Sequence, residues 1–185
     1  MKKIIVVGCP GSGKSTFSRK LHRLTDIPLY HLDMMYWNKN KTTVEKEIFL
    51  ERLEEVLKKD GWIVDGNYIS TMEMRMNACD TVIFLDYPVD VCLDGINARR
   101  GKPRADMPWT ETEEDAEFVE FIKNFNTRIR PTLIDLLDKH SDKNIIVLKS
   151  RSQAENFLFE LKNTHCQRIL ENSELRCFER EYNEE

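Results

Sequence analysis

The stretch GCPGSGKST at residues 8–16 follows directly on the apolar run Ile4–Val7. It fits the pattern G-x-x-x-x-G-K-[ST], in which glycines let backbone N–H groups and the N-terminus of the following helix face a phosphate chain. We therefore expect a buried strand, a phosphate-binding loop and a helix in that order. In such a loop Lys14 reaches the β- and γ-phosphates of a nucleotide, and the hydroxyl of Ser15 binds Mg²⁺. The residues expected to hold the nucleotide are Gly8, Cys9, Pro10, Gly11, Ser12, Gly13, Lys14, Ser15 and Thr16.

Composition places the chain among ordinary globular proteins. Its 185 residues fit one domain, and 41% hydrophobic with 32% charged residues is typical of a soluble protein. The apolar runs are too short for a transmembrane helix, so we expect a cytoplasmic protein without a membrane partner. The net charge of −4 argues against broad contact with a nucleic-acid backbone. An odd number of cysteines, five, without a C-x-x-C pair predicts neither a disulfide framework nor a zinc site.

Strand and helix patterns alternate along the chain, which predicts a parallel sheet with helices on both faces. Strands are expected at residues 4–7, 27–32, 62–64, 81–85 and 144–149. Helix starts are expected at three capping boxes, Thr42 with Glu45, Thr110 with Glu113 and Ser152 with Glu155. The predicted organisation is one domain over residues 1–162, with a mobile lid at about 99–112, and a charged tail over 163–185 that could form a helix.

Three of the expected strands are followed by an acid, namely Asp33, Asp65 and Asp86. Ligands of an open parallel sheet bind beyond the carboxyl ends of its strands, so these side chains are candidate site residues. Asp65 is suited to hold Mg²⁺ through water, and Asp33 is suited to position or deprotonate an acceptor hydroxyl. Asp86 precedes a Tyr-Pro pair and is equally well explained as a turn or cap residue.

Cationic side chains gather in the polar segment 99–109 and again just before Pro131. Guanidinium groups stabilise the charge that spreads over phosphoryl oxygens, especially under a closed lid. The alternative is a solvated basic loop. The predicted catalytic residues are Lys14, Asp33, Arg99, Arg104, Arg128 and Arg130.

The acceptor side is predicted from residues near Asp33 and Asp65. Arg75, on a short helix expected over 71–77, could pair with a phosphate or carboxylate of the acceptor or cap an acid. Aromatic residues beside the two acids are either pocket walls or loop anchors. The candidate acceptor-binding residues are Asp33, Tyr36, Trp37, Asp65, Asn67, Tyr68 and Arg75.

These segments resemble the small P-loop kinases of the adenylate kinase and shikimate kinase group, and within it the bacterial topology modulation, or adenylate kinase-related, proteins. The likeness is carried by GCPGSGKST, HLDMMYW from His31, GWIVDGNY from Gly61, DTVIFLDYP from Asp80, the arginine-rich lid, NFNTRIRP from Asn124 and NIIVLKSR from Asn144. It implies a three-layer α/β P-loop NTPase sandwich with a five-stranded parallel sheet, and a lid that closes over ATP.

The resemblance also implies roles for single residues. Lys14 and Ser15 match the phosphate and magnesium residues of the loop, Asp33 matches the acid that touches the acceptor, and Asp65 matches the acid of an Asp-Gly pair. Arg99 matches an arginine at the first hinge of the lid. Gly95 stands where adenylate kinases carry an arginine that packs on adenine, so a preference for ATP over GTP does not follow.

Two classes of function are compatible with the sequence. The first is an ATP- and Mg²⁺-dependent phosphotransferase, monomer or homodimer, whose small-molecule acceptor is a nucleoside monophosphate or a hydroxyl metabolite. The second is a nucleotide-binding regulatory protein associated with DNA topology that carries out no productive transfer. The acidic net charge weighs against DNA contact, and the presence of Lys14, Asp33 and Asp65 weighs against lost chemistry.

Overall fold

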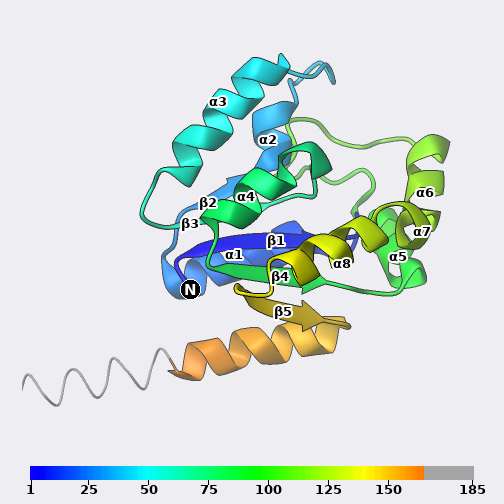
Figure 1. The fold of residues 1–185 in the computed structure, drawn as a ribbon. Helices are drawn as coiled ribbons and strands as arrows, with labels where there is room; N and C mark the ends of the chain where they lie inside the picture. Colours follow the sequence, from blue (N-terminus) through cyan, green and yellow to red (C-terminus); the bar gives the residue numbers. More distant parts are fainter. Residues whose placement is uncertain (165–185) are drawn as a thin grey trace, which may run out of the picture.

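The computed structural model describes residues 1–164 and contains a five-stranded, all-parallel sheet in the order β2-β3-β1-β4-β5 (Figure 1). The predicted α/β fold is confirmed. The strands are β1 (Lys3–Gly8), β2 (Leu29–His31), β3 (Trp62–Asp65), β4 (Thr81–Leu85) and β5 (Asn144–Leu148). Residues Ile4–Val7 of the central strand are fully buried, because helices cover both faces of a parallel sheet.

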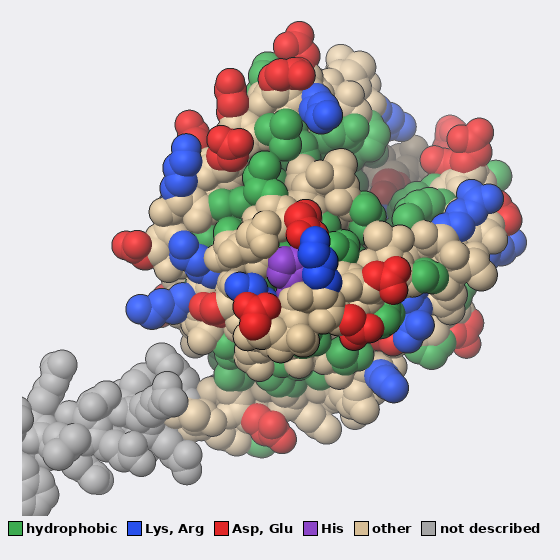
Figure 2. All heavy atoms as spheres, in the orientation of Figure 1, with side chains coloured by type: hydrophobic (Ala, Val, Ile, Leu, Met, Phe, Trp, Pro, Cys, Tyr) green, Lys and Arg blue, Asp and Glu red, His purple; other side chains and the backbone are tan. Residues whose placement is uncertain are grey.

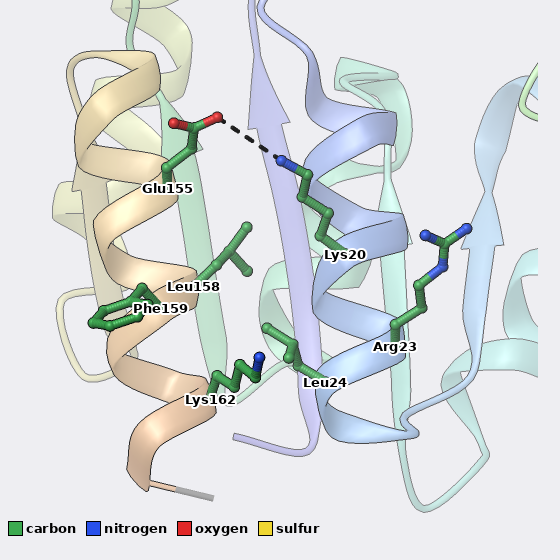
Figure 3. Close-up of a pocket in the computed structure, with 7 residues that line it drawn as sticks. All are labelled: Lys20, Arg23, Leu24, Glu155, Leu158, Phe159 and Lys162. Carbon is green, nitrogen blue, oxygen red and sulfur yellow. Dashed lines mark ion pairs between the residues drawn. The ribbon is translucent and has the colours of Figure 1, made fainter.

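Helices form a layer on each side of the sheet. On one face α1 lies beside the helix over residues 151–164 (Figure 3), with the rings of Phe17 and Phe157 stacked 6.2 Å apart. On the other face lie α4 and α8 (Figure 1), joined by an ion pair of 2.6 Å between Glu73 and Lys139. The helices are α1 (Lys14–Thr25), α2 (Leu32–Tyr36), α3 (Lys46–Leu57), α4 (Met72–Ala78), α5 (Val89–Arg99), α6 (Ala116–Lys123), α7 (Phe125–Arg128), α8 (Arg130–Lys139) and 151–164, with a 3₁₀ turn at Ile69–Thr71.

The three predicted capping boxes are wrong. Helix α3 begins only after Glu45, which makes no side-chain cap, and at α6 the cap is Asp115, which accepts from the backbone N–H of Phe118. At the last helix the reciprocal pattern lies two residues earlier than predicted. The Ser150 hydroxyl accepts from the N–H of Gln153, whose side chain accepts from the N–H of Lys149. Ser/Thr followed by Glu/Gln is frequent in a charged chain, so the pattern alone does not fix the start.

Strand β2 is shorter than the predicted 27–32, since pairing begins at Leu29 and Leu32 already belongs to α2. The residues of the predicted tail beyond Thr164 lie outside those described. Within residues 1–164 no helix combines the length and apolarity needed to cross a membrane. Acidic and basic side chains are interspersed over the face shown in Figure 2.

Helix α5 packs so closely on the phosphate loop that a side chain at Gly95 has no space. A Cβ atom there would lie 2.0 Å from the carbonyl oxygen of Gly11. Gly95 is therefore explained by backbone contact, and an arginine at this position could not reach a base without displacing the helix.

We expect Gly95→Ala to lower the free energy of unfolding by roughly 1–3 kcal/mol, because the added methyl overpacks this contact. Gly61→Ala is the matched control, since its Cβ would meet its nearest neighbour at 3.4 Å. Denaturant unfolding of both variants measures the difference. Equal stability of the two would show that α5 adjusts without cost.

Candidate active site

The carboxyl ends of the strands open into a cleft of about 1380 Å³. Residues of the phosphate loop, of the segments after β2 and β3, and of the segment after α5 line it together. The sheet order explains this arrangement, because β3 stands between β1 and β2 and its end connects the two. We refer to the segment 99–112 as the lid.

The phosphate loop has the backbone geometry that its glycines permit. Gly11 and Gly13 have φ of 84° and 92°, a region that favours glycine, and α1 starts at Lys14 with its N-terminus toward the cleft. The Lys14 ammonium donates to the carbonyls of Gly8 (2.8 Å) and Cys9 (3.1 Å). Residues Pro10–Thr16 line the cleft, whereas Gly8 and the buried Cys9 lie beneath it.

Asp33 is held by Tyr68. The Tyr68 hydroxyl donates to Asp33 Oδ1 at 2.7 Å, and both residues line the cleft. Burial raises the pKa of Asp33, while the Tyr68 hydrogen bond and the charges of Lys14 and Arg104 act in the opposite direction. One carboxylate oxygen is thus fixed by Tyr68, which leaves the other for a ligand.

The residue before Tyr68 joins this acid to the phosphate loop. Asn67 accepts from the N–H of Gly8 at 3.1 Å and donates to its carbonyl at 2.9 Å. Two consecutive residues after β3 therefore bind the loop on one side and Asp33 on the other. This pair therefore fixes the position of Asp33 relative to the loop over residues 8–16.

Arg75 lies beneath the segment over residues 66–68 and holds it in place. Its prediction as an acceptor ligand is thereby corrected. Its side chain is fully buried and donates to the carbonyls of Gly66, Asn67 and Tyr68. It does not line the cleft. Burial lowers the pKa of Arg75 to about 9, which leaves it charged at neutral pH. Its two Nη groups hold the segment that carries Asn67 and Tyr68, whereas the buried Nε has no partner among the described residues.

Asp65 is 3% exposed and is not among the residues that line the cleft, so its predicted contact with an acceptor stays a prediction. Its Oδ1 lies 2.8 Å from His31 Nδ1, and its buried Oδ2 has no hydrogen-bond partner among the described residues. The sequence reasoning missed His31, although it stands two residues before Asp33 in the HLDMMYW motif. The orphaned oxygen is compatible with the predicted contact to Mg²⁺ through water.

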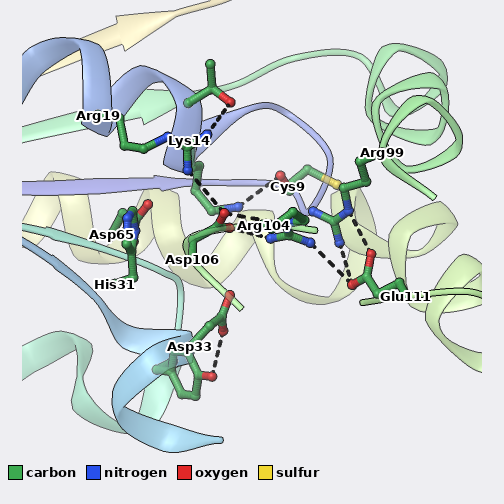
Figure 4. A network of polar contacts seen from close by, with 12 residues as sticks. Cys9, Lys14, Arg19, His31, Asp33, Asp65, Arg99, Arg104, Asp106 and Glu111 are labelled. Atoms are coloured by element: carbon green, nitrogen blue, oxygen red, sulfur yellow. Dashed lines mark hydrogen bonds and ion pairs between the residues drawn. The ribbon is translucent and has the colours of Figure 1, made fainter. Parts of the chain in front are cut away.

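The lid is fixed by ion pairs that its composition did not reveal (Figure 4). Asp106 is 2% exposed and pairs with Arg104 and, at 3.1 Å, with Arg19 of α1. Glu111 accepts two hydrogen bonds of 2.9 Å from Arg99. Burial opposes ionisation of Asp106, but Arg104 and the Ser15 hydroxyl outweigh it and hold its pKa far below the usual range. The structure shows the lid connected to α1 by the ion pair between Asp106 and Arg19, and its predicted mobility stays a prediction.

Arg128 and Arg130 are not among the residues that line the cleft, so the structure adds no support for their predicted catalytic role, which stays a prediction. Arg130 makes a two-pronged ion pair with Asp86, at 2.7 and 2.8 Å, and Arg128 is exposed on α7. The pairing settles the open reading of Asp86 as well. Its carboxylate anchors the start of α8 against the end of β4.

A second hollow lies between α1 and the helix over 151–164 (Figure 3). It is about 310 Å³ in volume and is lined by Leu24, Leu158 and Phe159 with lysine and arginine side chains at its rim. No residue of the phosphate loop reaches it. The larger cleft is therefore the candidate active site.

The comparisons with known proteins support the fold. No family model and no curated protein matches the chain. Among solved structures, a shikimate kinase from Acinetobacter baumannii in complex with shikimate is 17% identical, with a TM-score of 0.58 over 93% of this chain and 94% of that one. A shikimate kinase from Bacteroides thetaiotaomicron is 21% identical, with a TM-score of 0.51 over 87% and 96%. This chain shares the fold of these P-loop kinases.

Proposed function

We propose that the protein transfers the γ-phosphoryl group of ATP to a hydroxyl of a small-molecule acceptor. The observation that carries this proposal is the bridge from Gly8 through Asn67 and Tyr68 to Asp33. It places a phosphate-binding loop and a carboxylate suited to an acceptor hydroxyl on opposite sides of one cleft. The fold shared with shikimate kinases adds support.

The residues present fit ATP and Mg²⁺. Pro10–Thr16 would hold the phosphates, because the loop and the start of α1 turn N–H groups toward the cleft. Ser15 would bind Mg²⁺, and the unpaired buried oxygen of Asp65 would hold one of its waters. When bound, Mg²⁺ neutralises phosphate charge.

The remaining roles belong to charged side chains that line the cleft. Asp33 orients the acceptor hydroxyl and takes its proton, and Lys14 stabilises charge on the transferred group. Arg104 and Arg99 supply further positive charge from the lid. As the acids Asp106 and Glu111 already pair with these arginines, an incoming phosphate chain must compete for them.

The test is a metabolite screen for ADP release from Mg·ATP that depends on an acceptor. Asp33→Asn should abolish this dependence and spare ATP binding measured by calorimetry, whereas Asp65→Asn should weaken Mg²⁺-dependent ATP binding as well. Identical behaviour of the two variants would refute the division of roles. Salt-sensitive DNA retention without ADP release would instead favour the regulatory protein, and with it the finer resemblance to topology modulation proteins.

The pH dependence of the reaction should report Asp33. The carboxylate acts in its ionised form, so kcat/KM should fall as pH drops through its raised pKa. Tyr68→Phe removes a donor that favours the ionised form, so the acid limb should move to higher pH. Tyr30→Phe is the control, because that hydroxyl accepts from Lys59 at the edge of the molecule. An unmoved acid limb in Tyr68→Phe would exclude Asp33 as the titrating group.

A further inference from the structure

The acceptor half of the cleft carries little positive charge. The residues that line it between β2 and the end of the segment after β3 are Asp33, Tyr36, Trp37, Lys41, Gly66, Asn67 and Tyr68. Of these described residues Lys41 is the one cation, and it is exposed. A phosphate or carboxylate bound beside Asp33 would have no buried cation from this half to pair with.

The charges of Lys14 and Arg104 reach Asp33, but the arginines near this half already have partners. Arg75 is turned beneath the cleft toward backbone carbonyls, and Arg52 donates to the carbonyl of Met35 outside it. Arg99 and Arg104 belong to the lid, where two acids already pair with them. An ATP phosphate chain competes for the same two guanidinium groups, so they are not free for a second anion.

The walls of this half are aromatic. The Tyr36 ring lies 5.2 Å from Trp37 and 5.0 Å from Tyr68, both in edge-on arrangements, and the buried Phe49 packs behind Tyr36 and Tyr68. Trp109 of the lid meets Trp37 edge-on at 5.2 Å. The contact connects the acceptor half to the lid. Such rings bind the apolar face of a ligand ring.

From these observations we infer that the acceptor is an uncharged polyhydroxy compound, a nucleoside or a cyclic polyol, that bears no phosphate or carboxylate. Its apolar face packs on Tyr36 and Trp37, and one hydroxyl donates to the free oxygen of Asp33. The inference rests on the proposed phosphotransferase and selects among its acceptors. In the transfer, the hydroxyl oxygen forms the bond to the γ-phosphorus as the bond to the β-phosphate oxygen breaks, and the proton passes to Asp33.

Charge and desolvation both disfavour an anionic acceptor. A second anion beside Asp33 adds like-charge repulsion in a half-buried site. An anionic group that loses its water on binding, without a cation to pair with, also pays a desolvation free energy. An uncharged hydroxyl group of the ligand needs one oxygen to accept its hydrogen bond, and Asp33 offers that oxygen. The contrast should therefore be sharp between compounds that differ by one anionic group.

The experiment compares matched pairs of acceptors in the ADP-release assay with Mg·ATP. The pairs are nucleosides against both their 3′- and 5′-monophosphates, so that one monophosphate keeps the reacting hydroxyl free, and cyclic polyols against the matching sugar or cyclohexane acids. We expect turnover with at least one uncharged member and at least a hundredfold lower kcat/KM for its anionic counterpart. Turnover restricted to anionic members would overturn the inference and leave the proposed function standing. No acceptor-dependent turnover with any member would overturn both.

Substitutions at Trp37 and Lys41, each with a matched control, add a second readout in the same assay. Trp37→Leu should raise the KM for the acceptor about tenfold with little change in the KM for ATP. Trp37→Phe keeps an aromatic ring, so its KM for the acceptor should lie close to that of the parent protein. The exposed Lys39→Met should leave the acceptor KM within twofold of the parent protein, and Lys41→Met is compared with it as the probe for an anion at the rim. A rise of tenfold or more in Lys41→Met alone would show that an anion is bound at the rim and would overturn the inference.

Discussion

Lys14→Ala is expected to lower acceptor-dependent ADP release by about a hundred- to thousandfold, a loss of roughly 3–4 kcal/mol of transition-state stabilisation. The ammonium is held by the carbonyls of Gly8 and Cys9 at the centre of the phosphate loop. From there it faces the charge that develops on the transferred group. No other cation of the loop itself, residues 8–16, can take its place.

The fold should survive this substitution, because the loop has a second attachment. The Gly8 carbonyl also accepts from Asn67, and its N–H donates to the same side chain. Circular dichroism should therefore show an unchanged melting temperature, and calorimetry should show ATP binding weakened less than turnover. Lys46→Ala, an exposed position at the start of α3, is the control. More than a tenth of the parent activity in Lys14→Ala would remove the loop lysine from the mechanism.

The features that the sequence predicted well are those that depend on short stretches of chain. Strand β4 lies over the predicted residues 81–85, and the phosphate loop lies where its motif stands, since glycine spacing and apolar runs act locally. The aromatic residues Tyr36, Trp37 and Tyr68 flank the two acids in sequence, and their role as walls of an acceptor pocket stays a prediction. All three line the cleft together with Asp33.

What the sequence could not predict depends on which charges meet in space. Asp106 and Arg19 are 87 positions apart, and Arg130 and Asp86 are 44 apart, so no local pattern links them. The composition of the segment, rich in Arg, Lys, Gly and Pro with few apolar residues, predicted a mobile lid. It did not show that the acids within the same segment neutralise the arginines and pin them to α1.

Arg75 is the clearest case in which the sequence did not show which groups meet in space. Its substitution is also expected to have the second large effect, on stability. Arg75→Met should lower the free energy of unfolding by about 3–5 kcal/mol, because three backbone carbonyls lose their donor in a buried site. For a chain of this size the melting temperature should fall by roughly 6–20 °C. Activity should fall with it, since the released segment carries Asn67 and Tyr68.

The conservative variant decides between a structural and a ligand-binding role. Arg75→Lys keeps the charge but replaces a planar group of five donors by a compact ammonium, so it should recover only part of the lost stability. If the guanidinium instead served the acceptor, both variants would melt like the parent protein and raise the acceptor KM. A loss of stability in Arg75→Met that Arg75→Lys partly restores means that this arginine builds the site from beneath, and that the acceptor binds without it.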